Sequence, residues 1–124
     1  MQLTLENPDF RYSLRGAGGD YALVNEQRLE ASFLLAPNDL VTGWRPATVA
    51  DLQPQDMDAV LAMQPALVLL GSGASLRFPA PAVMATCLTR GIGIEVMDNA
   101  AAARTFNGLA TEGRRVVAAF LIQP

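Results

Sequence analysis

The sequence predicts a mixed α/β sandwich in which helices pack on a central, largely parallel sheet. Two observations predict this class. From about residue 48 onward, apolar runs of strand length alternate with segments of helical spacing, which is typical of βα units. Before that point, short aromatic and aliphatic runs are separated by turn-forming residues, so the amino-terminal part is predicted to be rich in β-structure.

Length and composition favour a single domain over residues 1–124. The chain has the usual length of one domain, and no repeat, low-complexity tract or linker divides it. With 51% hydrophobic and 17% charged residues, it is richer in apolar side chains than an average soluble domain, so an ordered core is expected. The same apolar surplus predicts self-association into a homo-oligomer.

The first third of the chain is predicted to form a meander or a pair of hairpins. The predicted strands cover residues 12–14, 21–24 and 29–35, and a short extended piece covers 40–44. Turns are expected at residues 16–20 and 25–28, because glycine, asparagine and aspartate favour turns. Pro37 and Asn38 are expected to end the third run.

Helices and strands alternate in the remainder. Helices are predicted at 54–63, at 80–89 and from Asp98 or Asn99 to 112, and strands at 66–70, 92–97 and 116–122. Met57, Val60 and Leu61 recur at helical spacing in the first helix, which Pro65 ends. Glycines at 91 and 113 are expected to end the other two helices.

Missing side chains exclude several reaction classes. The sequence contains no histidine and no lysine. Without histidine there is no Ser-His-Asp or Cys-His nucleophile and no histidine-ligated metal, and without lysine there is no Schiff base and no P-loop lysine. These absences favour a non-enzymatic role that uses neither a metal nor a cofactor, although a partner subunit could supply a missing group.

Charge and hydropathy bear on partners and compartment. Nine scattered arginines against 12 carboxylates give a net charge of −3 and no basic stripe, which argues against a nucleic-acid partner. The most apolar stretch, 59–71, is too short to span a bilayer, and residues 1–11 lack the basic start and apolar core of a signal peptide. Cys87, the single cysteine, is expected to be a small buried hydrophobe. A cytoplasmic location is therefore expected.

Two turns carry the candidate ligand-binding residues. Gly71, Ser72 and Gly73 follow a predicted buried strand, and Asp98 and Asn99 follow the next strand. Ligands of open α/β sheets bind at the carboxyl ends of strands, where glycines let backbone N–H groups approach an anion and the nearby arginine at 77 could add a bidentate contact. A tight turn and a helix cap explain the same residues equally well.

The third predicted helix and the single tryptophan add further candidates. Arg104 and Asn107 are spaced i,i+3, so they are expected to project from one side of the helix and could take part in recognition. A buried ion pair between Glu112 and the following arginines is the structural alternative. Trp44 could anchor the packing of the two parts of the chain or project toward a partner.

The sequence resembles a known family in four segments. These are GSG at 71–73, GIGIEVMDN at 91–99, RTFNGL at 104–109 and EGRRV at 112–116. They resemble the Mth938-like domain-of-unknown-function family that includes mitochondrial respiratory complex I assembly factor three and the adipogenesis-associated proteins. The resemblance covers roughly residues 44–121 and implies a three-layer α/β fold with a mixed central sheet and no established catalytic activity.

The chain departs from the family pattern at four positions. The family usually has threonine at Ser72 and at Asn99, and these changes keep a small polar side chain. It tends to have cysteine at Ala103 and tyrosine at Phe106, so a mechanism that needs that thiol or phenol is not supported here.

Two functional hypotheses follow. The first is a non-enzymatic binding or assembly module that presents the crevice between the two turns, and adjoining apolar surface, to a protein partner. The second is a small-molecule binder or modest enzyme that holds an anionic group on the glycine loop and the Asp98–Asn99 turn.

Overall fold

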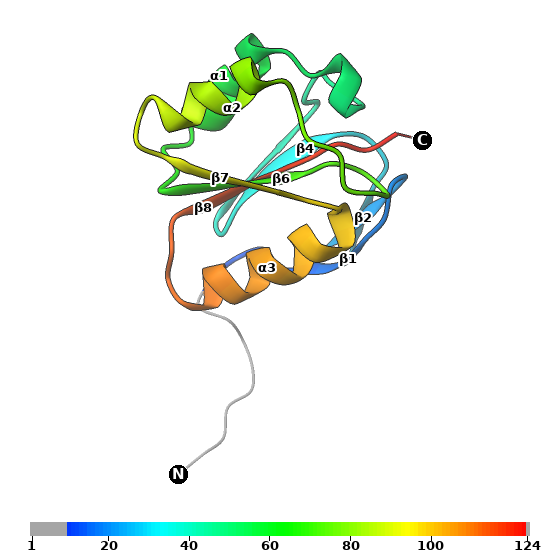
Figure 1. Ribbon diagram of the computed structural model, residues 1–124. Helices are drawn as coiled ribbons and strands as arrows, with labels where there is room; N and C mark the ends of the chain where they lie inside the picture. The colour runs from blue at the N-terminus through cyan, green and yellow to red at the C-terminus, as the bar shows by residue number, and fades with distance from the viewer. Residues whose placement is uncertain (1–9, 124) are drawn as a thin grey trace.

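Three layers make up the structure (Figure 1), a computed structural model that describes residues 10–123. A five-stranded sheet lies in the middle, with α1 and α2 on one face and α3 and a small three-stranded sheet on the other. The strands are β1 (Leu14–Ala17), β2 (Ala22–Val24), β3 (Gln27–Leu29), β4 (Phe33–Ala36), β5 (Asp39–Thr42), β6 (Leu67–Gly71), β7 (Gly93–Met97) and β8 (Val116–Phe120). The helices are α1 (Met57–Leu61), α2 (Pro81–Leu88) and α3 (Asn99–Thr111), preceded by the short 3₁₀ helices Val49–Asp51 and Pro54–Asp56. This architecture confirms the predicted fold class.

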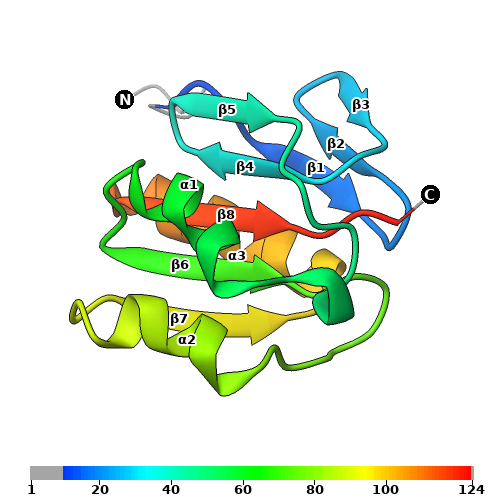
Figure 2. The same cartoon turned by 90° about the horizontal axis from the view of Figure 1, so that it is seen from above.

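The central sheet is mixed, with the strand order β5-β4-β8-β6-β7 (Figure 2). β6 is parallel to both β7 and β8, whereas β4 is antiparallel to β8 and β5. All five residues of β8 are buried because it is the middle strand and both of its faces are covered. The last predicted strand is therefore the centre of the fold.

The amino-terminal meander differs from the prediction in the bounds of several strands. The run 29–35 was predicted as one strand, but β3 ends at Leu29 and β4 begins at Phe33 in the other sheet. A strand was also predicted at 12–14, but the observed strand, β1, begins two residues later, at Leu14, and continues to Ala17. The chain leaves the small sheet after Leu29 and enters the central sheet at Phe33, and both sheets require apolar residues there, so the sequence pattern does not mark the crossing.

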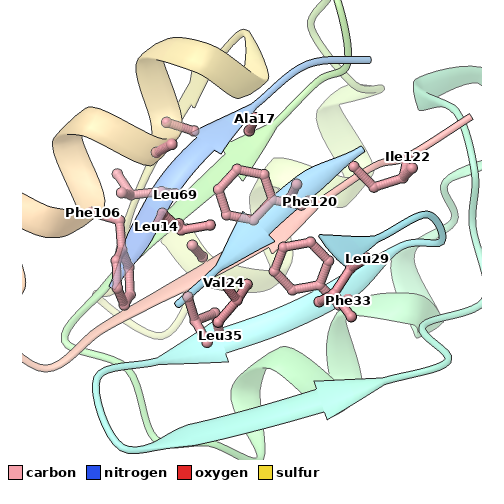
Figure 3. Packing of buried hydrophobic residues seen from close by; sticks show 14 of the residues in the cluster. Leu14, Ala17, Val24, Leu29, Phe33, Leu35, Leu69, Phe106, Phe120 and Ile122 are labelled. Atoms are coloured by element: carbon pink, nitrogen blue, oxygen red, sulfur yellow. The ribbon is translucent and has the colours of Figure 1, made fainter. Parts of the chain in front are cut away.

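Two hydrophobic clusters hold the layers together. One lies between the central sheet and the layer of α3 and β1–β3, where the Phe33 and Phe120 rings stack with centroids 5.0 Å apart (Figure 3). Burying each of these rings contributes about 1.5–3 kcal/mol. The other cluster lies on the opposite face, under α1 and α2, and contains Cys87, which is fully buried as predicted.

The predicted helix 54–63 is shorter than expected. Pro54–Asp56 forms a 3₁₀ turn, and α1 covers only Met57–Leu61. Trp44 packs into the cluster beneath this helix, and its indole N–H donates to the Asp56 carbonyl at 3.0 Å. Trp44 is 8% exposed, which confirms that it anchors the core.

The structure bears on the expectation about a membrane span but not on the one about a signal peptide. Across residues 10–123, no helix is long and apolar enough to cross a membrane. The stretch 1–11, on which the expectation about a signal peptide depends, lies almost wholly outside the described residues.

Candidate functional site

The turns that follow β6 and β7 meet at one edge of the central sheet. Gly71 and Met97, the last residues of the two strands, are paired in register. Just beyond them, the Asn99 N–H donates to the Gly73 carbonyl at 2.9 Å, and the Gly73 N–H donates to Asn99 Oδ1 at 3.1 Å. The structure thus brings five of the sequence-predicted site residues together, at the carboxyl ends of parallel strands.

The Asn99 side chain is fully buried and hydrogen-bonded at every polar atom. Besides accepting from Gly73, its amide donates to the Gly18 carbonyl at 2.8 Å and to the Leu121 carbonyl at 2.9 Å. A Cβ atom on Gly71 would overlap Asn99 Oδ1, so the glycine is required for the close approach. Asn99 therefore ties three separate segments to the end of β6.

Ser72 organises the loop that leaves the sheet. Its hydroxyl donates to the Ser75 carbonyl at 2.8 Å and accepts from the Arg77 N–H at 3.1 Å. The backbone N–H of Ser72 donates to the Met97 carbonyl at 2.9 Å. The N–H groups of Ser72 and Gly73 both donate within the protein, so an anionic ligand would have to compete with these bonds.

Asp98 is the N-cap of α3. Its Oδ1 accepts from the Ala101 N–H at 2.8 Å, which satisfies one of the amide groups left unpaired at the helix start. Its carboxylate also places a negative charge where an anion would approach the helix. The structure thus gives Asp98 the capping geometry that the sequence offered as an alternative.

Arg104 and Asn107 lie further along α3, away from the two turns. The Asn107 amide bridges to the backbone of β1: Oδ1 accepts from the Leu14 N–H at 2.8 Å, and Nδ2 donates to the Leu14 carbonyl at 2.6 Å. Arg104 is exposed. In this arrangement Asn107 attaches the helix to the small sheet, and Arg104 faces solvent.

A groove opens beside the two turns, and we call it the rim groove. Its volume is about 570 Å³, within the range of ligand sites. It is lined by Gly19, Asp20, Ala47, Thr48, Val49, Ala50, Ser72, Gly73, Ala74, Ser75, Arg77, Leu121 and Gln123. Asn99 lies beneath this surface and does not line it.

The loop Leu76–Phe78 follows the rim groove and carries exposed apolar side chains. Leu76 is 52% exposed and Phe78 is 68% exposed, and Arg77 between them lines the groove. Among the described residues, the other exposed large apolar side chains are Leu88, at 57%, and Val41, at 42%. Sequence reasoning noted Arg77 but missed its two neighbours, because a short apolar pair in a loop has no periodicity.

Arg45 and two aspartates brace the segment that forms one wall of the groove. The guanidinium makes two hydrogen bonds to the Asp56 carboxylate, at 2.8 and 2.6 Å, and one to Asp51 at 3.0 Å. These bonds lower the pKa of Asp56 and of Asp51 below their ordinary range. Asp51 also accepts from the Ala47 N–H at 3.2 Å, which fixes the start of the wall. The sequence did not predict this cluster.

The two adjacent arginines correct a further expectation. Arg114 and Arg115 lie directly before β8. Arg114 approaches Glu112 only to 4.0 Å, and both side chains are more than half exposed, at 51% and 64%. The buried ion pair predicted between helix and strand is therefore wrong, because the connection turns outward after α3 and leaves these charges in solvent.

The residues lining the rim groove suit recognition by hydrogen bonds and apolar contact. Hydroxyls, a carboxylate, an amide and a guanidinium are present, but none forms a nucleophile–base pair. Across residues 10–123, no group of three or more histidine, cysteine, aspartate or glutamate side chains could hold a metal ion.

Fold and site together define a small three-layer α/β protein with a groove at the carboxyl ends of its parallel strands. A family model described as a protein of unknown function, DUF498/DUF598, matches residues 14–121, and the chain belongs to this family. The chain is also 32% identical over 115 residues to NADH dehydrogenase (ubiquinone) 1 alpha subcomplex assembly factor 3 of Bos taurus. The match covers 91% of this chain but 59% of that protein, so the chain spans little more than half the length of this relative.

Solved bacterial structures share the fold. A Xanthomonas campestris protein is 55% identical with a TM-score of 0.83, and the match covers 98% of this chain and 92% of that one. A Bordetella parapertussis protein is 33% identical with a TM-score of 0.83, covering 90% and 96% of the two chains. A Bordetella pertussis protein described as a Mth938-like domain is 28% identical with a TM-score of 0.79, covering 98% and 92%. These likenesses confirm the family resemblance seen in the sequence.

Proposed function

We propose that the chain is a non-enzymatic binding module of assembly type that presents the rim groove and the Leu76–Phe78 loop to a protein partner. The exposure of Phe78 and Leu76 beside the groove carries this proposal. Aromatic side chains flanking a pocket are frequent anchors of protein interfaces, because they bury a large apolar area at low entropic cost.

The loop is ordered before any partner arrives. Ser72 holds both Ser75 and Arg77 through its hydroxyl, and Gly19 packs so closely on Ala74 that an added Cβ would lie 2.8 Å from the alanine Cβ. An ordered loop loses little conformational entropy on binding, so more of the contact energy appears as affinity. This preorganisation supports a docking role over that of a mobile linker.

The charge on the loop indicates the kind of partner. In the described part of the chain, no carboxylate lies within ion-pair distance of the Arg77 guanidinium. A partner segment that combines an apolar side chain with a carboxylate would cover Phe78 and pair with Arg77 at once. The bovine relative is named as an assembly factor, and an assembly role requires such a protein contact.

Site-specific photo-crosslinking tests this proposal. The photoreactive residue p-benzoylphenylalanine at position 78 is expected to capture a distinct partner in the source cell, whereas the same residue at position 88, which is 57% exposed in the wild type, is not. The captured protein, purified separately, should bind the wild-type chain and lose at least about tenfold in affinity to Phe78→Ser, as the loss of an interface anchor implies. Equal capture at both positions, capture of a second copy of the chain alone, or equal affinity for the variant would overturn the proposal.

A further inference from the structure

A second cavity lies at the end of the sheet opposite the rim groove, and we call it the connection pocket. Its volume is about 370 Å³. Its lining includes Phe10, Ala36, Asp39, Met63, Arg114 and Arg115. β8 runs through the middle of the sheet (Figure 2). Val116, at its start, lines the connection pocket, and Leu121, after its end, lines the rim groove, so the two cavities lie at opposite ends of this strand.

Three connections form the connection pocket: the turn between β4 and β5, the segment between α1 and β6, and the segment between α3 and β8. Hydrogen bonds fix each of them. The Ala66 N–H donates to the Arg115 carbonyl at 2.8 Å, and the Arg114 N–H donates to the Leu109 carbonyl at 3.1 Å. On the other side, Asn38 Oδ1 accepts from the Arg11 N–H at 2.9 Å. Hydrogen bonds from backbone N–H groups therefore fix the walls, as in a preformed ligand site.

The lining combines an apolar part with a cationic part. The partly exposed side chains of Phe10, Ala36 and Met63 supply the apolar surface. Two guanidinium groups, those of Arg114 and Arg115, belong to the exposed part of the lining, against one carboxylate from Asp39. Guanidinium groups beside apolar surface suit a ligand that has a negative end and an apolar body.

Neither arginine is committed to a strong internal contact. The only described carboxylate within ion-pair distance of Arg114 is Glu112, at 4.0 Å and between exposed side chains, which is a weak pairing. For Arg115, no described carboxylate lies within that distance. A bound anion would therefore not have to break an established salt bridge.

We propose that the connection pocket binds a small organic anion with an apolar body, of the class of medium-chain monocarboxylates. The carboxylate pairs with Arg114 and Arg115, and the hydrocarbon chain covers the partly exposed side chains of Phe10, Ala36 and Met63. This site is independent of the protein-binding surface at the opposite end of the sheet.

Titration of the isotope-labelled full chain with octanoate, followed by NMR, tests the proposal. Saturable shifts are expected at the amides of residues 110–117, and octanol, which lacks the charge, should bind at least about tenfold more weakly. The double variant Arg114→Gln/Arg115→Gln should lose a similar factor. Arg104→Gln, an exposed arginine outside both cavities, is the matched control and should stay within about twofold of the wild type.

Three results would overturn the proposal: octanol binding as well as octanoate, shifts that map away from residues 110–117, or an equal loss of affinity in Arg104→Gln. Unperturbed spectra of the variants without ligand show that they remain folded. Arg77 lines the rim groove, so Arg77→Gln should leave octanoate binding unchanged. Failure of the octanoate proposal would therefore not imply failure of the protein-binding proposal, which depends on the rim groove.

Discussion

Asn99 and Gly73 hold each other through two hydrogen bonds, one from the Asn99 N–H to the Gly73 carbonyl at 2.9 Å and one from the Gly73 N–H to Asn99 Oδ1 at 3.1 Å. This mutual contact joins the turn after β6 to the start of α3. The Asn99 amide extends the same connection to Gly18 and Leu121. The rim groove therefore has a rigid base, and its geometry depends on one buried side chain.

Replacement of Asn99 by alanine is expected to lower the free energy of unfolding by about 3 kcal/mol. The change leaves the Gly73 N–H and the carbonyls of Gly18 and Leu121 without their partner, and a buried unsatisfied polar group costs about 1–3 kcal/mol. Urea denaturation measures the loss. Asn38→Ala, which removes one exposed side-chain bond, is the matched control and should cost less than about 1 kcal/mol. Equal losses would contradict the structural role of Asn99.

Gly71→Ala is expected to destabilise the fold by about 2 kcal/mol, because the added methyl group would overlap Asn99 Oδ1 and lie 3.0 Å from Phe120 Cδ1. Gly108→Ala provides the matched control. That glycine lies within α3 with nothing within 4 Å of an added Cβ, so alanine should stabilise the helix by about 0.5–1 kcal/mol. Thermal unfolding of the two variants should therefore shift in opposite directions, and a shift of the same sign would refute the packing argument.

The Cys87 thiol is expected to resist modification in the folded protein. It is fully buried, and burial raises the pKa of the thiol, so little thiolate is present. Reaction with Ellman's reagent at pH 8 should be at least about 100-fold slower than in denaturant, because it requires the protein to open. In the double variant C87A/L88C the thiol moves to an exposed neighbouring position and should react at once. Fast labelling of the wild type would show that α2 opens readily.

Acid should weaken the Arg45 cluster in a predictable direction. Hydrogen bonds from Arg45 lower the pKa of Asp56 in the folded state, so the charged carboxylate stabilises the fold above its unfolded pKa of about 3.9. This contribution is lost as the pH falls through the lower, folded pKa. Asp56→Asn should reduce the Tm by about 3 °C at pH 7 and make the acid side of the stability profile shallower.

The matched control for the acid experiment is Asp39→Asn. Asp39 is exposed and, like Asp56, belongs to the described part of the chain, but none of the ion pairs found there includes it. Its variant should keep the wild-type profile between pH 3 and 7. A profile that is equally steep in Asp56→Asn and the wild type would show that the Arg45 cluster does not contribute to acid stability.

The second half of the fold was predictable because its signals are local. Apolar runs of strand length, the Asp98 cap and the terminating glycines placed β6, α2, β7, α3 and β8 within a few residues of their observed bounds. The crossing between β3 and β4 was not predictable. Leu29 and Phe33 are both buried, but in different sheets, and hydrophobic spacing does not identify the sheet to which a residue belongs.

The candidate site was predictable only in part, for a similar reason. The meeting of the Gly73 and Asn99 turns follows from two neighbouring parallel strands, so local sequence was sufficient. The contacts of Arg45 with Asp51 and Asp56 span 6 and 11 residues of irregular backbone, and no periodicity relates them. The connection pocket depends on three distant connections meeting, which only tertiary structure shows.

Asn107 and Arg104 offer a direct test of whether α3 is built for packing or for recognition. Asn107→Ala should lower the free energy of unfolding by about 1–3 kcal/mol, because both of its hydrogen bonds attach the helix to the backbone of Leu14. Arg104→Ala, one helical turn earlier and exposed, should change stability by less than about 0.5 kcal/mol. If the two variants unfold with equal free energies, the hydrogen bonds from Asn107 to β1 contribute little to stability. If both variants also weaken binding of the crosslinked partner, this face of α3 belongs to the interface.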